Sequence, residues 1–277
     1  NGTTWVKSYK YSFTYDENNN QTEQISQNWS GSVWTNSYRY LSTYNSNNKT
    51  TLERYQSWNG TTWVDNSRYV YTYDANRNAI QYDYQTWSGT AWVNYFRYSS
   101  AYNANNKVTE QISSNWDGTA WVNTNRYTFT YDANNNQTEY LYQTWDVSVW
   151  KNNFRYSYSY NSNNDITQLT TQSWDGAVWV NNDKYTLTYD ARYNRTEILG
   201  QIWDVAVWKN SYKDSYLYDA NDNRTQYIYQ SWDGSVWVNQ DRSLITYVAG
   251  HYQTSITLNT SYTFDDPTKT TSYQIIG

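Results

Sequence analysis

Several residue types are absent or scarce in this chain of 277 residues. It has no cysteine, no methionine, one proline and one histidine, His251. Without cysteine, the chain can have no thiol catalysis, no disulfide bonds and no cysteine-ligated zinc. No apolar run approaches the roughly 20 residues of a membrane helix, so we expect no membrane span. A net charge of −5 and the lack of any basic run argue against a nucleic-acid partner.

The start and the composition of the sequence bear on where the protein works. The sequence begins at Asn1, without an initiator methionine or a signal peptide, which indicates a mature or excised fragment of a longer protein. The chain is acidic, lacks cysteine and is rich in Asn, Thr, Tyr and Trp. This composition is typical of proteins outside a bacterial cell, and we expect an extracellular or cell-surface location.

What the sequence has in abundance is tryptophan, placed on a strict lattice. One Trp recurs every 29 residues, at Trp5, Trp34, Trp63, Trp92, Trp121, Trp150, Trp179, Trp208 and Trp237. Its companion recurs at Trp29, Trp58, Trp87, Trp116, Trp145, Trp174, Trp203 and Trp232, which accounts for all 17 tryptophans. Such repetition predicts an array that presents a surface or a length rather than a single reaction centre.

Each copy alternates large rings with polar side chains at a period of two, which predicts β-strands. Short turns such as Trp-Asp-Gly at 116–118 favour hairpins, because glycine accepts a positive φ. We therefore predict an all-β fold, an antiparallel β-hairpin meander of 29-residue repeats over residues 1–247. Strict alternation in the copy that begins at Trp121 would put Tyr127, Phe129 and Tyr131 on the face of that tryptophan.

The odd period raises a question of parity. If every turn held an even number of residues, the rings of successive copies would fall on opposite faces of the sheet. We expect a bulge or an odd-numbered loop in every copy; the alternative is a structural unit of 58 residues. The turn residues hint at that longer alternation, since Asp16, Asp74 and Asp132 alternate with Asn45, Asn103 and Asn161, although Asp219 breaks the rule.

Twist should shape the sheet. Adjacent strands rotate by roughly 20–25°, so many strands in succession predict a sheet twisted or coiled into a spiral or superhelix. Equivalent positions of successive copies would then lie about 10 Å apart.

Three further ladders follow the lattice. Basic residues recur at Lys10, Arg39, Arg68, Arg97, Arg126, Arg155, Lys184, Lys213 and Arg242, and threonines and glutamines recur at positions that begin with Thr22 and Gln27. We expect the cations to pair across strands with Glu23, Glu110, Glu139 and Glu197. Ligand recognition by the basic ladder and ice binding by the threonines are the alternatives.

The segment Tyr-Thr-Phe-Thr-Tyr-Asp-Ala-Asn-Asn-Asn-Gln-Thr-Glu at 127–139 resembles the YD repeat of Rhs and teneurin-type proteins. The resemblance covers about half of every copy and implies strand pairs of a long sheet that spirals into a shell or tube. The period is longer than that of the family, and the Trp-Asp-Gly hairpin is an addition. The pattern also resembles extracellular tandem-repeat surface proteins of Bacteroidetes.

The turns and the acidic residues are candidates for a metal site and for a catalytic site. Asp132-x-Asn134-x-Asn136 is similar to the start of a calcium loop, but it lacks the later glutamate and the central glycine. We therefore predict no metal and no other cofactor. Nearly every acid recurs by lattice position, and His251 has no evident partner, so we expect no enzyme activity.

Two functions remain. The first is a structural or adhesive segment of a secreted or surface-attached bacterial protein. The alternative is a glycan-binding module, in which rings stack on sugars and repetition adds avidity. Its candidate binding residues are Trp63, Trp92, Trp121, Trp150, Trp179, Trp208, Tyr73, Tyr131 and Tyr189. Expected partners are a polysaccharide or another surface protein, with end-to-end self-association. A more remote alternative is an Rhs-like shell segment.

The lattice ends before the chain does. Over residues 248–277 the Trp pair is missing and the one proline, Pro267, appears. Alternation at Thr254–Leu258 and Thr271–Ile275 predicts further strands. We interpret this segment as a divergent cap or a junction, since the edge of an array needs covering.

Overall fold

The computed structural model describes residues 7–248 and 252–259. Within these ranges the chain forms eighteen strands and no helix. The strands are β1 (Tyr9–Tyr15), β2 (Gln21–Trp29), β3 (Trp34–Tyr44), β4 (Thr50–Trp58), β5 (Trp63–Tyr73), β6 (Ala79–Trp87), β7 (Trp92–Tyr102), β8 (Val108–Trp116), β9 (Trp121–Tyr131), β10 (Gln137–Asp146), β11 (Val149–Tyr160), β12 (Ile166–Trp174), β13 (Trp179–Tyr189), β14 (Arg195–Asp204), β15 (Val207–Tyr218), β16 (Arg224–Trp232), β17 (Trp237–Val248) and β18 (Tyr252–Asn259).

The chain divides into two compact units. Unit 1 comprises Asn1–Phe129 and Tyr142–Lys151, and unit 2 comprises Thr130–Leu141 and Asn152–Gly277, so that β9, β10 and β11 contribute to both. From β1 to β9, and again from β11 to β18, each strand pairs antiparallel with the next strand in sequence. The predicted antiparallel meander is confirmed.

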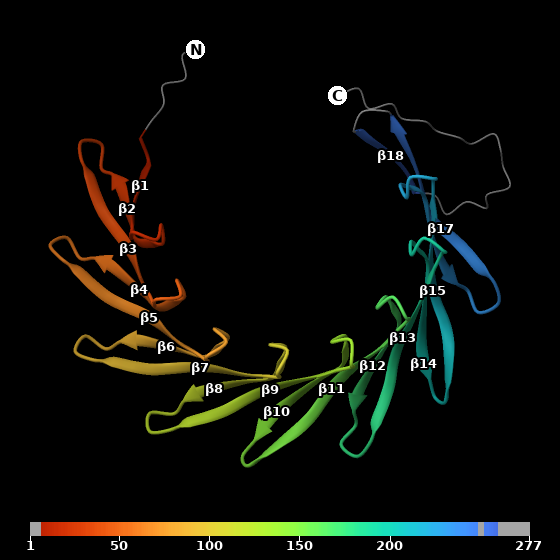
Figure 1. Cartoon of the computed structure of the whole chain (residues 1–277), viewed down its shortest axis with the longest axis horizontal. Coiled ribbons are helices and arrows are strands. Elements are labelled where there is room, and N and C mark those ends of the chain that lie inside the picture. Colours follow the sequence, from red (N-terminus) through yellow and green to blue (C-terminus); the bar gives the residue numbers. More distant parts are fainter. Residues whose placement is uncertain (1–6, 249–251, 260–277) are drawn as a thin grey trace. The chain divides into compact units, whose positions relative to one another are not determined.

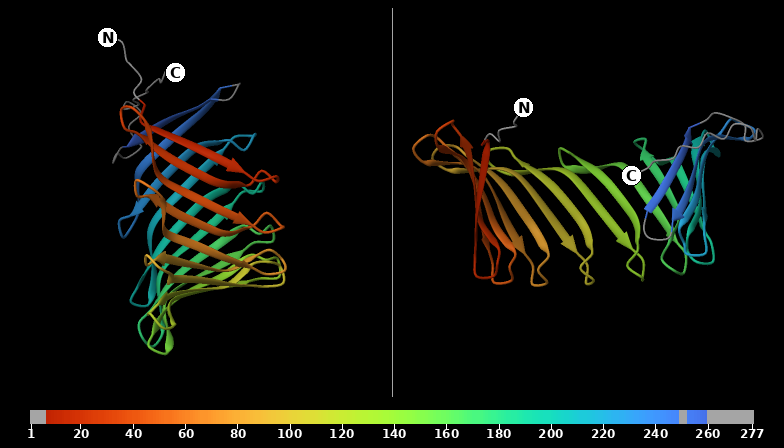
Figure 2. Two further views of the ribbon diagram at one scale, coloured as in Figure 1. Left: turned by 90° about the vertical axis from the view of Figure 1, so that its left-hand side faces the viewer. Right: turned by 90° about the horizontal axis from the view of Figure 1, so that it is seen from above.

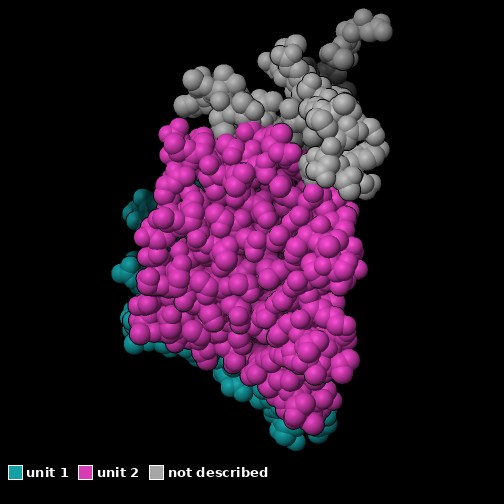
Figure 3. Space-filling model, turned by 90° about the vertical axis from the view of Figure 1, so that its right-hand side faces the viewer, with its two compact units in different colours: residues 1–129, 142–151 teal, residues 130–141, 152–277 magenta. Residues whose placement is uncertain are grey.

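Within each unit the sheet is curved, and the direction of successive strands changes progressively (Figures 1 and 2). This is the behaviour expected from strand twist. In Figure 3 the visible face of unit 2 is a continuous surface of side chains over its described strands. No helix among the described residues is long and apolar enough to cross a membrane.

The sheet has almost no hydrophobic core. Most described strand residues are half-buried, and the well-buried large apolar side chains are Tyr216 and Ile245, which are 8% and 5% exposed. Several of the most buried side chains are polar, with Ser26 only 1% exposed. No second layer covers the sheet among the described residues. Contacts between neighbouring strands must therefore hold it, and each such contact contributes about 0.2–1 kcal/mol.

The parity question is answered by bulges and by an odd loop. One copy consists of a strand of 11 residues, the five-residue loop 45–49, a strand of 9 residues and the four-residue loop 59–62. This copy also has two shifts of register: Ser37 has no partner in β2, and Thr51 has none in β3. The same two shifts recur in the copies that begin at Trp63, Trp92, Trp179 and Trp208. The 29-residue copy is therefore itself the structural repeat, and equivalent side chains keep the same face.

One expectation about faces was wrong. In β9, Ser113 pairs with Asn125 and Ser114 with Asn123, so Thr124 is the extra residue of a bulge. Because the bulge reverses the alternation, Tyr127, Phe129 and Tyr131 lie on the face opposite to Trp121. We call the face with Trp121 and Arg126 the tryptophan face, and the face with Tyr127 and Phe129 the tyrosine face; the same names apply to the equivalent positions of every copy.

The 58-residue alternation survives in the five-residue loops. The Asn20 side chain donates to Asn48 Oδ1 at 3.1 Å, and equivalent bonds join Asn78 to Asn106 and Asn136 to Asn164. Neighbouring five-residue loops are thus tied in pairs, although the strands repeat every 29 residues.

The divergent end of the chain is only partly described. The strand predicted at Thr254–Leu258 is part of β18, which pairs antiparallel with β17. The strand predicted at Thr271–Ile275, His251 and Pro267 lie outside the described residues, and the role of 248–277 as a cap stays a prediction.

Candidate functional site

The tryptophans of each pair face one another across a hairpin, with four residues between them in the sequence. Trp116 and Trp121 are direct cross-strand partners, with ring centroids 5.2 Å apart and an interplanar angle of 66°. All eight pairs have this edge-to-face geometry, with distances of 4.9–5.2 Å and angles of 61–68°. Such a pair contributes about 0.5–1.5 kcal/mol beyond the area it buries.

In seven of the eight pairs, a cation from the preceding copy covers the second tryptophan. The guanidinium of Arg97, on β7, lies 4.4 Å from the ring centroid of Trp121, on β9, and so reaches across β8. The same contact joins Arg39 to Trp63 (5.0 Å), Arg68 to Trp92 (4.5 Å), Arg126 to Trp150 (5.9 Å), Arg155 to Trp179 (4.7 Å), Lys184 to Trp208 (4.8 Å) and Lys213 to Trp237 (5.0 Å). The six tryptophans predicted to bind a ligand thus have a cation on one ring face.

The basic ladder also pairs with acids, as predicted. Arg39 lies 3.3 Å from Glu23 and Arg155 lies 3.5 Å from Glu139, and Arg126 pairs with Glu110. Glutamines extend these contacts: Arg39 Nε donates to Gln56 Oε1 at 2.5 Å. Glu197, the fourth predicted partner, is directly opposite Ser215 instead. Arg39, Arg126 and Arg155 are thus each held between an acid of the preceding copy and the indole of the next copy.

The tyrosines proposed as binding residues tie strands together. The Tyr73 hydroxyl donates to the Thr50 carbonyl at 2.7 Å, and that of Tyr189 donates to the Ile166 carbonyl at 2.8 Å. Burial raises the pKa of Tyr131. The hydroxyls of Tyr73 and Tyr189 are therefore already engaged with the backbone of a neighbouring strand.

The aspartates of the turns serve their own loops. Asp132 Oδ1 accepts the backbone N–H groups of Asn134 and Asn136, both at 2.9 Å, and Oδ2 accepts the side-chain amide of Asn136 at 3.0 Å. The N–H of Asn136 is the first of the interactions that lower the pKa of Asp132. Across the described part of the chain, no three His, Cys, Asp or Glu side chains gather in a group that could hold a metal ion.

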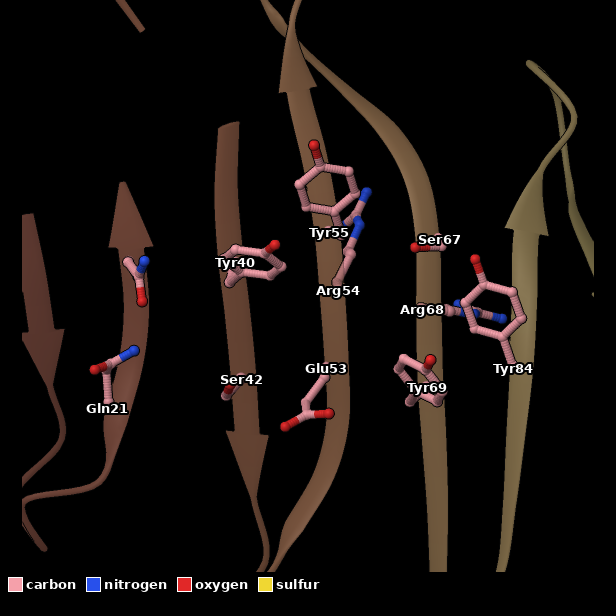
Figure 4. Close-up of a pocket in the computed structure, with 11 residues that line it drawn as sticks. Gln21, Tyr40, Ser42, Glu53, Arg54, Tyr55, Ser67, Arg68, Tyr69 and Tyr84 are labelled. Atoms are coloured by element: carbon pink, nitrogen blue, oxygen red, sulfur yellow. The ribbon is translucent and has the colours of Figure 1, made fainter. Parts of the chain in front are cut away.

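A groove on the tyrosine face of unit 1 was not foreseen from the sequence. It has a volume of about 460 Å³. Two close ring pairs flank it: Tyr40 and Tyr55, with centroids 5.0 Å apart, and Tyr69 and Tyr84, 4.9 Å apart (Figure 4). Its lining is completed by Gln21, Gln24, Ser42, Glu53, Arg54, Ser67 and Arg68.

Glu53 is the feature of the groove that the sequence could have revealed. Its positional equivalents at 29-residue steps are Gln24, Tyr82, Gln111, Tyr140, Leu169, Ile198 and Tyr227. Leu52 takes the place held elsewhere by Glu23 and Glu110, so the acid of this copy is displaced by one residue. A displacement of one residue moves a side chain to the other face of a strand, which is why Glu53 lies on the tyrosine face.

Comparison with known proteins finds only weak structural similarity. No protein-family model and no curated protein matches the chain. A protein of unknown function from Bacteroides fragilis is 15% identical with a TM-score of 0.36, covering 44% of this chain and 92% of its own. TcdB2-TccC3 is 12% identical with a TM-score of 0.42 over 90% of this chain and 15% of its own. A porin-like protein from Bacteroides uniformis is 12% identical with a TM-score of 0.31, covering 90% of this chain and 92% of its own. Similarities this low assign neither a family nor a function.

Proposed function

We propose that this chain is a non-catalytic structural and adhesive repeat segment of a secreted or surface-attached bacterial protein. In this role its work is to extend a sheet copy by copy and to present both faces of that sheet to its surroundings. The observation that carries the proposal is the contact between the cation of one copy and the tryptophan of the next, because this contact recurs at seven successive junctions between copies.

Because the junctions between copies are similar, the sheet should tolerate a change in the number of copies. In repeat proteins, stability is approximately the sum of terms for each copy and for each junction between neighbours. The Arg97–Trp121 and Arg68–Trp92 contacts have nearly the same length, 4.4 and 4.5 Å. Loss of one copy should then shorten the sheet without disrupting the neighbouring copies.

Deletion of residues 92–120 tests this role. The deletion joins Ala91 to Trp121 and keeps the Gly-Thr-Ala-Trp sequence of the turn intact. We expect the shortened chain to keep its strand content and a cooperative thermal transition. We also expect the full and the shortened chain to coat a surface equally well. A matched deletion of residues 92–107, which removes β7 and the loop after it, should reverse the direction of the strands that follow and abolish the transition. Equal loss of folding in both deletions would contradict the proposal.

A surface location is part of the proposal, and the composition of the chain supports it. The chain is acidic, has no cysteine and exposes both faces of a polar, ring-rich sheet. Protease treatment of intact producing cells tests the location. An extracellular segment should be degraded while cytoplasmic proteins survive, and protection of the chain until lysis would exclude this location.

The tyrosine groove favours glycan binding as a second candidate function. Tyrosine rings offer flat surfaces for sugar rings, and Gln24, Ser42 and Ser67 offer hydrogen bonds. A volume of about 460 Å³ is typical of small-molecule sites. The tryptophans are less suitable, because a cation already covers one face of each predicted binding ring. A glycan array probed with the wild-type chain and with Tyr69→Ala tests this candidate, which predicts binding by the wild type and its loss in the variant.

The resemblance to YD repeats supports a third candidate, a segment of a shell.

A further inference from the structure

The tyrosine face of β2 to β8 carries a single charged side chain. The arginines of these strands alternate with the tyrosines: Arg39 is next to Tyr40, and Arg68 is next to Tyr69. Since successive residues of a strand point to opposite faces, these guanidinium groups lie on the tryptophan face, where Arg68 contacts Gln85 and Trp92. Glu53 is the exception to this segregation of charge.

Glu53 has one polar contact on its own face. The Tyr71 hydroxyl donates to Glu53 Oε2 at 2.6 Å, and burial, followed by this hydrogen bond, raises the pKa of Tyr71. No ion pair joins Glu53 to any cation in the described part of the chain. Arg54, its neighbour in sequence, is paired with Asp65. Although Arg54 and Arg68 also line the groove, neither forms an ion pair with the Glu53 carboxylate.

Rings surround this carboxylate. Glu53 is directly opposite Ser42 on β3 and Tyr69 on β5, while Tyr40 and Tyr55 form the next row (Figure 4). Ser42 and Ser67 are small, which keeps the space beside the rings open. The faces of tyrosine rings attract cations within about 6 Å, and a partly desolvated carboxylate adds to that attraction.

We propose that this groove binds a sugar that carries a protonated amino group. The inference rests on the second candidate function and adds the charge of the ligand to it. The ammonium pairs with the free oxygen of Glu53 and lies over a tyrosine ring. The sugar hydroxyls bind Gln24 and the serines, and the ring of the sugar stacks on the Tyr69 and Tyr84 pair.

The test is titration of the full chain with three probes, at low salt and at a mildly acidic pH at which the sugar amines are protonated. These are the tetramer of glucosamine, the tetramer of N-acetylglucosamine, and choline. The first has amines, the second has the same rings without the charge, and the third has a cation without a sugar. We expect the glucosamine tetramer to bind at least about tenfold more tightly than the other two, because hydrogen bonds to charged groups are worth that much.

Four variants complete the design. Glu53→Gln keeps the shape of the groove and should weaken binding of the glucosamine tetramer by about tenfold, and Tyr69→Ala should weaken it similarly. Tyr69→Phe keeps the ring and should bind as the wild type does. Glu110 is an acid of the tryptophan face and pairs with Arg126. Glu110→Gln removes this acid and should leave binding of the glucosamine tetramer unchanged.

The outcomes separate the proposals. Equal binding of the charged and the acetylated tetramers, unaffected by Glu53→Gln, would overturn this inference and leave glycan binding standing. Choline binding as tightly as the glucosamine tetramer would overturn the role of the sugar. Absence of binding by every probe and by a glycan array would overturn both the inference and the second candidate function. None of these results bears on the structural role of the repeats.

Discussion

Gly200 lies directly opposite Tyr212, and the tyrosine ring covers the glycine. A Cβ at position 200 would meet Tyr212 Cε1 at 2.4 Å, well inside van der Waals contact. Tyr212 also packs against Tyr185 and Tyr229, with centroids 6.2 and 6.0 Å apart. The glycine therefore makes room for the ring that links three strands of unit 2.

Gly200→Ala should destabilise the chain because the ring must move away from both neighbours. We expect a loss of about 1–3 kcal/mol, the usual cost of overpacking, measured by urea unfolding. The double variant Gly200→Ala with Tyr212→Ala is the control, since the added methyl group then meets no ring and should cost little beyond Tyr212→Ala alone. Equal costs of Gly200→Ala in both backgrounds would show that the clash is not the cause.

Two hairpin turns contain a valine in an unfavourable conformation. Val147 has a φ of 55° and Val205 a φ of 56°, and the two side chains are 91% and 94% exposed. A β-branched residue rarely adopts a positive φ, and such a residue costs about 1–3 kcal/mol. Exposure means that almost no packing offsets this cost.

Val147→Asn and Val205→Asn should each raise the free energy of unfolding by about 1 kcal/mol, because asparagine tolerates this conformation. Thermal denaturation measures the gain. Val149→Asn is the control: the side chain is 53% exposed but lies in a strand, and its replacement should bring no gain. A stabilisation shared by all three variants would point to solubility rather than to backbone strain.

The tyrosine hydroxyls that reach a neighbouring strand should contribute to stability. In Tyr73→Phe the ring remains but the bond to the Thr50 carbonyl is lost. We expect a loss of about 0.5–1.5 kcal/mol, the net value of a hydrogen bond, by urea unfolding. Tyr95→Phe alters a ring that is 62% exposed and should be neutral. A cost as large for Tyr95→Phe would argue that the Tyr73 bond adds nothing specific.

High pH should unfold the chain through its tyrosines. Burial raises the pKa of Tyr212 to about 12, and burial with a hydrogen bond to Asp214 raises that of Tyr227. A raised pKa in the folded state gives stability that is complete below the unfolded value, about 10, and is lost as pH rises through the folded value. We therefore expect stability to fall between about pH 10 and 12.

The absorbance of tyrosinate and the far-ultraviolet circular dichroism, followed together, measure this effect. Ionisation of the late-titrating tyrosines should coincide with the loss of strand signal. If all tyrosines ionise near their ordinary pKa while the strands persist, the rings are not held as the structure shows.

The sequence predicted most of the fold, but not the assignment of faces. The tryptophan lattice and the alternation of rings were sufficient for the strands and their order. The bulge escaped detection because its extra residue has no constant type: it is Ser37 in one copy, Asn66 in the next and Thr124 in another. Nothing in such a series marks an unpaired residue.

The candidate site was predicted less well for a related reason. The residues predicted to bind a glycan were the most regular ones of the repeat. Their rings and hydroxyls already contact other parts of the repeat, as Trp121 contacts Arg97 and Tyr73 contacts Thr50. The groove instead centres on Glu53, an irregular residue. In an array, the positions that hold copies together must recur, so a departure from the lattice is the better guide to a local site.

The contact between Arg97 and Trp121 tests the central claim most directly, because it joins two copies across an intervening strand. The measurement is a double-mutant cycle of Arg97→Met and Trp121→Leu by urea unfolding of the full chain, in which the coupling free energy isolates the pair. The account predicts a favourable coupling of about 0.5–1 kcal/mol, the value of an exposed cation–π contact. Strictly additive effects of the two substitutions would contradict the claim that these contacts hold successive copies together.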